Sequence, residues 1–248
     1  MTSQASPGAA RADTRATGIL MLASAVLSIV FVALDPEVAA TTSRAILEGF
    51  VANEPMHRAV HAVELACVLG LALGFTSLAA RLGTQRPAVR GATIAYLAGS
   101  LAMVAAAVTD GFISGDVASY YLRAGHSVET GREMIHLVYV VVQDFAAVAW
   151  LLQSTGVLAM AGVMLRERGL PRIVGVLGLA SGLVPPIAIV ATWPMMDGGV
   201  VIGVLLAQLA WNVAASVLLM RRASRGADSQ FEPQAGIQAP STLRHAQP

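Results

Sequence analysis

Long uncharged apolar segments restrict what this chain can fold into more than any other feature of its sequence. The first runs from Thr17 to Leu34 without a charged residue, about the length that an α-helix needs to cross the hydrocarbon core of a bilayer. Similar segments follow at approximately 59–80, 91–109, 137–165, 173–193 and 199–220, and only the 137–165 segment is longer than a span requires. The sequence therefore predicts an all-α fold, a polytopic transmembrane helical bundle of six spans.

Composition supports lipid rather than water as the main solvent of this chain. Hydrophobic residues make up 56% of the 248 positions and charged residues only 12%, whereas a soluble domain is about one quarter charged. All 16 basic residues are arginine and the net charge is +1, without the clustered basic face that nucleic acid needs. The arginine bias indicates a GC-rich bacterial genome. We therefore expect a multi-pass protein of the bacterial plasma (inner) membrane, with the lipid bilayer and no nucleic acid as partner.

The arginines also predict which side of the membrane each connection faces. Cytoplasmic connections retain positive charge, and here the arginine groups fall on alternate connections of the six-span arrangement. The intervening connections carry acidic residues, including Asp35, Glu54 and Asp116. Both chain ends are therefore predicted to be cytoplasmic (N-in/C-in). The segments predicted to be inside carry Arg11 and Arg15, then Arg81, Arg86 and Arg90, then Arg166, Arg168 and Arg172, and finally Arg221, Arg222 and Arg225.

The two ends of the chain differ from the apolar segments between them. Residues 1–15 are rich in Ala, Ser and Thr, and residues 223–248 are rich in Pro, Gln, Ser and Ala, without apolar periodicity in either segment. Such segments bury too little apolar surface to fold, so both are predicted to be disordered cytoplasmic tails. They flank a six-helix transmembrane domain at 16–222. The Thr17–Leu34 segment is longer than the apolar part of a usual cleaved signal peptide, which favours a retained span.

Two local patterns predict how the helices begin and pack. Ser43 precedes apolar side chains that share one face of a short helix at 43–51. This helix is predicted to lie on the membrane surface, on the outer side. Glycines four residues apart let helices approach closely. Such pairs are Gly70 and Gly74, Gly178 and Gly182, and Gly199 and Gly203.

The run GVLAMAGVMLRERGLPRIVGVLGLASGL, residues 156–183, places a Gly-Leu-Pro-Arg turn at 169–172 between the fourth and fifth spans. Together with Gly175 and Gly182, this turn resembles a signature of an uncharacterised family of bacterial six-helix membrane proteins, catalogued as a domain of unknown function. The first span, the segment AILEGFVANEP and the second span beginning MHRAVHAVEL also follow in that family's order. The resemblance implies the fold only, because the family brings no accepted activity, cofactor or catalytic residue.

A group of polar residues marks a candidate metal site near the outer ends of the spans. Counting about 20 residues outward from the inner arginines reaches His61 and Asp110. His57, His61 and Glu64 share one helix face because their spacings are four and three. Imidazole and carboxylate together suit a divalent metal such as zinc. With His136 at the start of the fourth span, the candidate ligands are His57, His61, Asp110 and His136.

This group has other interpretations that the sequence leaves open. The same residues would also be satisfied as hydrated groups at the membrane interface. As part of a functional site, they could instead handle protons, with Glu64 or Asp144 as the carrier. Haem ligation would need two histidines that face each other across the bundle.

Polar residues at mid-depth give a second candidate region. Gln208 and Asn212 lie one turn apart on the sixth span, at the depth of Pro185 and Pro186 on the fifth. Their amides would either satisfy carbonyl groups freed by a proline kink or line a polar cavity beside a broken helix. The predicted polar cavity is lined by Glu64, Asp144, Gln208 and Asn212.

No sharper catalytic pattern singles out one function. The chain has no P-loop, no HExxH and no GxSxG, and the single Cys67 excludes an intramolecular disulfide. Three hypotheses follow. The first is a small-molecule or ion binding or transport-type module with an outward-facing polar cavity. The others are a membrane-embedded metal-dependent enzyme or redox protein and a structural or accessory protein. The sequence indicates neither the ligand nor the oligomeric state.

The topology predicts the outcome of a reporter fusion. A reporter fused after Arg222 should give a cytoplasmic signal, because that arginine group lies on the inner side in a six-span arrangement. Paired alkaline phosphatase and green fluorescent protein fusions would measure the side, with a fusion after Glu54 as the outer control. A periplasmic signal after Arg222 would contradict the arrangement.

Overall fold

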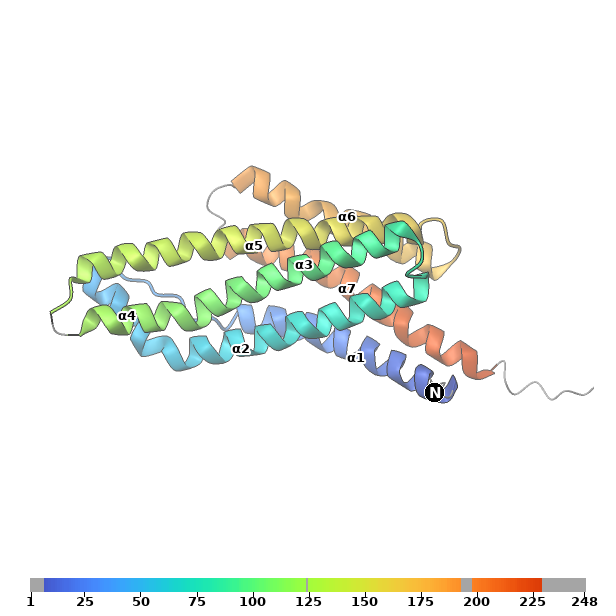
Figure 1. Cartoon of the computed structure of the whole chain (residues 1–248), viewed down its shortest axis with the longest axis horizontal. Helices are drawn as coiled ribbons and strands as arrows, with labels where there is room; N and C mark the ends of the chain where they lie inside the picture. Colours follow the sequence, from blue (N-terminus) through green and yellow to red (C-terminus); the bar gives the residue numbers. More distant parts are fainter. Residues whose placement is uncertain (1–6, 124, 193–197, 229–248) are drawn as a thin grey trace, which may run out of the picture.

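The chain is all-helical over the residues that its computed structural model describes, 7–123, 125–192 and 198–228 (Figure 1). Six helical segments are long and apolar enough to cross a membrane, which confirms the predicted six-span helical architecture. The elements are α1 (Pro7–Val32), α2 (Ser43–Leu82), α3 (Pro87–Val108), the π-helix η1 (Thr109–Ile113), α4 (Ser114–Leu122), α5 (Val128–Met164), α6 (Leu170–Thr192) and α7 (Gly198–Asp228). α3, η1 and α4 follow one another without a break and form one 36-residue span.

The spans pack as a closed ring. α1 contacts α2, α2 contacts α3, α3 contacts α5, α5 contacts α6, α6 contacts α7, and α7 returns to α1. Large apolar side chains such as Leu101, Ile187 and Val190 point outward and are mostly exposed. Polar residues such as Gln153, Ser181 and Asn212 are buried instead. An apolar exterior around a partly polar interior is what a lipid environment favours.

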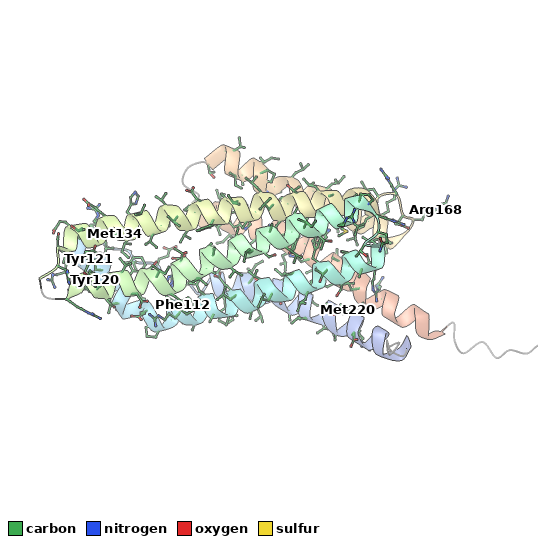
Figure 2. All side chains as sticks on the ribbon, in the orientation of Figure 1. Phe112, Tyr120, Tyr121, Met134, Arg168 and Met220 are labelled. Atoms are coloured by element: carbon green, nitrogen blue, oxygen red, sulfur yellow. The ribbon has the colours of Figure 1, made fainter. Side chains whose placement is uncertain are left out.

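Three of the spans are longer than a bilayer requires. α2 has 40 residues, the Pro87–Leu122 segment has 36 and α5 has 37, against about 20 for a single crossing. These helices extend together past α6 and α7, at the end where Figure 2 labels Tyr120 and Tyr121, and Arg168 lies at the opposite end. We call the first the projecting end and the second the arginine end. Leu47, Ala118 and Ile135 form a small apolar core within the projecting end.

The segment 43–51 differs from its prediction. It does not form a separate surface helix but makes up the first turns of α2, whose start is capped by Thr42 as its side chain accepts from the N–H of Ala45 at 3.3 Å. Its apolar face packs on α4 and α5, where Leu47 is fully buried and Phe50 and Val51 are partly buried. The apolar face of this segment is therefore buried against other helices of the protein rather than against lipid.

Helix boundaries also extend beyond the predicted domain. α1 begins at Pro7 and α7 runs to Asp228, so both helices continue into segments predicted to be disordered tails. Ala-rich sequence next to an established helix propagates it at little cost. The predicted tail residues 1–6 and 229–248 lie outside the described residues. Between α5 and α6, Gly169 has a φ of 72°, which favours glycine, and Pro171 sits in the first turn of α6.

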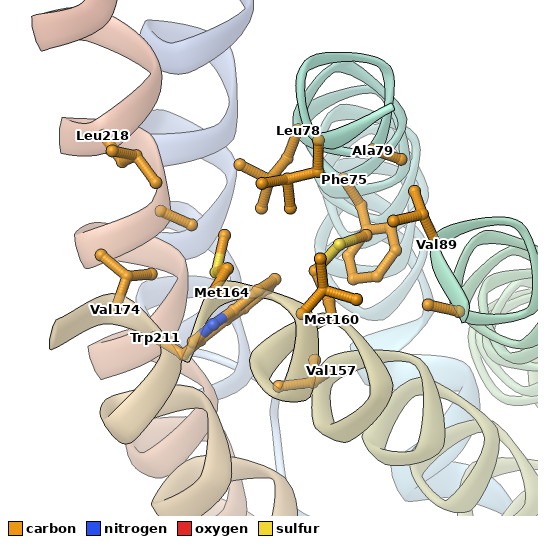
Figure 3. Close-up of a cluster of buried hydrophobic side chains, with 14 of the residues drawn as sticks. Phe75, Leu78, Ala79, Val89, Val157, Met160, Met164, Val174, Trp211 and Leu218 are labelled. Carbon is orange, nitrogen blue, oxygen red and sulfur yellow. The ribbon is translucent and has the colours of Figure 1, made fainter. Parts of the chain in front are cut away.

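Apolar side chains fill the interior of the ring in the half of the bundle nearer the arginine end. Phe75 and Tyr96 stack with ring centroids 4.0 Å apart, and Trp211 lies 5.8 Å from Phe75. Figure 3 shows Met160 and Met164 reaching into the same space between the helices. These residues belong to the largest buried cluster, to which α1, α2, α3, α5, α6 and α7 all contribute, and which we call the core plug. The interior of the ring is therefore closed toward the arginine end.

The glycine pairs differ in what they contact. A β-carbon at Gly70 would overlap the side chain of Ser24, and one at Gly74 would lie 2.6 Å from the side chain of Met21. This pair lets α1 approach α2 closely, as predicted. Gly203 has nothing within 4 Å, so the predicted close packing at the Gly199 and Gly203 pair is wrong for that position.

This difference predicts opposite effects for the same substitution. Gly74→Ala should lower the stability of the detergent-solubilised protein by about 1–3 kcal/mol, because the new methyl group overpacks the contact with Met21. Gly203→Ala is the matched control and should be neutral or stabilising by up to about 1 kcal/mol, since alanine is the better helix former. Thermal unfolding followed by circular dichroism would measure both. Equal melting temperatures for the two variants would contradict the assigned packing.

Candidate metal centre

Four side chains from three parts of the chain converge on one side of α2. Asp35 follows the last turns of α1, His57 and His61 lie on α2, and Asp110 lies on η1. Asp35, His57 and His61 each offer a ligand atom, and these atoms lie within 4.8 Å of one another. Oδ2 of Asp110 lies 3.6 Å from Nε2 of His61. We call these four residues the His/Asp cluster.

The local backbone explains how Asp110 reaches the histidines. The helix that starts at Pro87 widens into a π-helix at Thr109–Ile113, and such insertions occur frequently at functional sites. Gly111 lies against the ring of His61, and a β-carbon on this glycine would overlap that side chain. The π-helix and the glycine together let η1 approach α2 and place Asp110 beside His61.

His57 connects the two aspartates. Its Nδ1 lies 2.7 Å from Oδ1 of Asp35, and its Nε2 lies 3.2 Å from the backbone oxygen of Asp110 and 3.4 Å from its Oδ1. Both ring nitrogens are therefore engaged by protein oxygens. In this arrangement His57 positions Asp35 and Asp110 relative to each other.

His61 has the geometry of a ligand. Its Nδ1 lies 2.6 Å from Oε2 of Glu64, in an ion-pair contact that is not aligned as a hydrogen bond. Its Nε2 faces Oδ2 of Asp35 at 3.7 Å and Oδ2 of Asp110 at 3.6 Å, and has no hydrogen-bond partner among the described residues. Histidines that bind metals usually direct the second ring nitrogen toward a carboxylate or a carbonyl group. Glu64 stands in that position behind His61.

The distances around Nε2 of His61 suit a cation better than hydrogen bonds. Separations of 3.6 and 3.7 Å exceed the usual N–H···O range of about 2.7–3.2 Å. For metal–ligand bonds of about 2.1 Å, neighbouring corners of a coordination tetrahedron lie about 3.4 Å apart. Nε2 of His61 is therefore separated from one oxygen of Asp35 and one oxygen of Asp110 by distances close to those between neighbouring ligands of a tetrahedral metal ion.

The charges around the cluster also favour a cation. Asp35, Asp110 and Glu64 bring carboxylates to two largely buried histidines, whose side chains are 10% and 7% exposed. The nearest arginine on α2, Arg58, binds elsewhere, because its Nη2 lies 2.8 Å from Glu54 and 2.6 Å from Asp116. Carboxylates brought together at low dielectric repel each other strongly unless a positive charge lies between them, and either protonated histidines or a bound metal ion would supply that charge.

The two histidines do not form a haem site. Their rings lie on one helix with centroids 4.6 Å apart, at an interplanar angle of 82°. Two axial ligands of a haem must approach the iron from opposite faces, which rings in this position cannot do.

A cavity extends from the His/Asp cluster into the ring. Its volume is about 240 Å³, and His61, Glu64, Asp35 and Asp110 line one part of it. Gln143, Trp150, Gln153 and Gln208 line other parts. The remaining wall is mostly apolar, and includes Val32, Val68, Leu71, Met103, Ala106, Ala107, Val142, Ala146, Val201 and Leu205. A site at the cluster would therefore adjoin a partly open, largely apolar space.

The mid-depth polar residues surround a smaller pocket. This pocket measures about 10 Å³, and its lining includes Gln208, Asn212, Ser181 and Gly182. Gln208 and Asn212 thus lie beside Ser181 and Gly182, about one helical turn before Pro185 and Pro186 on α6. About one water molecule fits a space of this size.

The structure separates the residues that the sequence grouped together. His57, His61 and Asp110 come together, whereas His136 is exposed on α5 and is not part of the cluster. Glu64 and Gln208 line the cavity, and Asn212 lines only the small pocket. Asp144 is exposed and lines neither, while its neighbour Gln143 faces the cavity. A step of one residue on a helix turns the side chain by about 100°.

Asp35 and Trp150 were not among the predicted site residues. Asp35 lies at the same depth as His61 when residues are counted from the arginines, but it sits in a turn after α1 where no helix spacing assigns it a face. Trp150 lies in an apolar run on α5 and looks like an ordinary core residue in the sequence. Only the packing of the ring places it at the cavity.

Comparison with known proteins adds no identification, because no protein-family model, no curated protein and no solved structure matches the chain. The candidate site therefore rests on its own geometry.

The contact at Gly111 makes a testable prediction. Gly111→Ala should displace the ring of His61, since the added methyl group occupies space that the ring fills. We expect a loss of about 1–3 kcal/mol in stability, as is typical of overpacking, measured by thermal unfolding in detergent. Gly91→Ala on α3, where nothing lies within 4 Å, is the control. A Gly111→Ala protein as stable as the Gly91→Ala protein would show that the π-helix does not hold His61 in place.

Proposed function

We propose that the chain is an ion or small-molecule binding membrane protein that holds a divalent transition-metal ion at the His/Asp cluster. The observation that carries the proposal is Nε2 of His61, which faces two aspartate oxygens at 3.6–3.7 Å with Glu64 behind the ring. His61, Asp35 and Asp110 are the proposed ligands. His57 and Glu64 position them. Mixed imidazole and carboxylate ligands favour zinc and related ions over magnesium or calcium.

The location of the site supports a role at the outer side of the membrane. The arginine-rich connections lie at the other end of the bundle, and the positive-inside rule places that end in the cytoplasm. His61 is 20 residues from Arg81 along α2, which corresponds to about 30 Å of helix, the thickness of the hydrocarbon core. On this basis we infer that the cluster faces the outside of a bacterial inner membrane, near the outer boundary of the lipid core. We also propose that the chain belongs to the six-helix membrane protein family that its Gly-Leu-Pro-Arg turn at 169–172 resembles.

The cavity favours a binding or transport-type role over a purely structural one. A protein that only scaffolds others has no need for an interior space bordered by carboxylates and histidines. The second candidate function is a metal-dependent enzyme, because the cavity would place a small molecule directly against the metal. The two functions share the metal site and differ in whether the bound molecule is changed.

Metal analysis of site variants tests the proposal. The purified wild-type protein, exposed to zinc and then desalted, should retain about one zinc ion per chain. His61→Ala should lose it, since the variant removes a ligand. His57→Ala and Glu64→Gln should bind zinc about 10–100-fold more weakly, as changes to groups that position metal ligands usually do. Elemental analysis and zinc titration with a competing chelator would measure both effects.

His126→Ala serves as the control. His126 is an exposed histidine at the projecting end, where its ring lies 4.3 Å from that of Tyr120 and away from the cluster. Its loss should leave zinc binding unchanged. Zinc retained equally by His61→Ala and by the wild type would overturn the assignment of the ligands, and a wild-type protein without zinc affinity would overturn the proposed function.

A further inference from the structure

The cavity beside the His/Asp cluster has a lining that does not suit a bare ion. Beyond Asp110 and Glu64, its walls are formed mainly by valine, leucine, alanine and methionine side chains. A cation that moved inward would lose its carboxylate neighbours and meet apolar surface, at a large cost in solvation. Further inward, the core plug around Phe75, Tyr96 and Trp211 closes the ring. The space therefore fits a molecule with an apolar body.

A few polar groups interrupt the apolar wall. Trp150 lines the cavity, is 4% exposed, and its Nε1 has no hydrogen-bond partner among the described residues. The side-chain oxygen of Gln143, also on the wall, is likewise without a partner there. Buried polar groups are rarely left unpaired, so each needs an explanation. A small number of polar groups on an apolar wall is typical of a site that orients an organic ligand.

The dimensions of the cavity agree with such a ligand. On α2 the wall runs from His61 to Leu71, and on α5 from Val142 to Gln153. Ten or eleven residues of helix correspond to a length of about 15 Å. This length extends from the proposed metal at one end to Gln153 and Gln208 at the other.

From these observations we propose that the cavity binds a small amphipathic molecule, whose oxygen-bearing head coordinates the metal and whose apolar body occupies the space between α1, α2, α3, α5 and α7. The inference rests on the proposed metal site and names the class of substrate that site would serve. Asp35, His61 and Asp110 leave coordination positions of a tetrahedral or five-coordinate ion to the head group. The apolar wall provides affinity for the body.

Alkyl hydroxamates of increasing chain length are suitable probes, because the hydroxamate head binds divalent metals through two oxygens. The protein would be loaded with cobalt, which replaces zinc and has a visible absorption spectrum that changes when a ligand binds. Affinity for the two-carbon to eight-carbon hydroxamates should rise by roughly fourfold per methylene group while the chain enters the cavity, and then level off. The two-carbon probe reports the metal alone.

Two variants distinguish binding of the alkyl chain inside the cavity from its insertion into the detergent around the protein. Ala146→Phe should fill the space opposite α2, so that affinity stops rising at a shorter chain, while cobalt and the two-carbon probe bind as in the wild type. Ala66→Phe adds the same ring at an exposed position on α2 and should leave the chain-length series unchanged.

The possible results distinguish the two proposals. Cobalt binding with a chain-length effect that Ala146→Phe shortens would support the inference. Cobalt binding with affinity independent of chain length, or with equal behaviour of the two phenylalanine variants, would overturn the inference and leave the metal site intact. Failure of the wild-type protein to bind cobalt or zinc would overturn the metal site and the inference together.

Discussion

Closure of the helical ring between α1 and α7 is the contact on which the interior of this protein depends. The two helices that complete the ring are the first and the last in the sequence. They meet near the arginine end at Gly18, where a β-carbon would lie 2.9 Å from Met220 and 3.1 Å from the carbonyl oxygen of Ser216. This close approach brings Trp211 on α7 within 5.8 Å of Phe75 on α2. Without it, the core plug would lose one of its sides, and the cavity would have no floor.

The candidate site depends on a different constraint, the close approach of η1 to α2. The π-helix at residues 109–113 sets the direction of the side chains that follow it, and Gly111 within it lets η1 lie against the ring of His61. The same approach brings the backbone oxygen of Asp110 to His57. The cluster is thus held by backbone geometry as well as by its own contacts, which is the kind of support that keeps ligand atoms in place before a metal arrives.

The sequence predicted the architecture well and the site only in part, for physical reasons. Span number followed from apolar length, because lipid leaves so few alternatives for the backbone. His57, His61 and Glu64 followed from helical spacing, since all three lie on one helix. The position of Asp35 depended on the turn after α1, which no helical spacing predicts. Asp144 was predicted to line the cavity, but its neighbour Gln143 does so, because one residue of helix turns the side chain by about 100°. The packing of the projecting end could not be predicted for a similar reason. The amphipathic stripe at 43–51 suits contact with a membrane surface and contact with another helix equally well.

The positions of the polar groups explain why the cavity is open toward the cluster and closed toward the arginines. The charged side chains that line the cavity lie near the level of His61 and Glu64, and the polar groups that line it further from the cluster are amides, a hydroxyl and an indole. At mid-depth, Gln153, Ser181 and Asn212 from α5, α6 and α7 gather around the small pocket, which has room for about one water molecule. The aromatic rings of Phe75, Tyr96 and Trp211 lie next to this small pocket and belong to the core plug. A ligand held at the cluster would therefore exchange through the open part of the cavity, and reaching the arginine end would require Phe75, Tyr96 and Trp211 to separate.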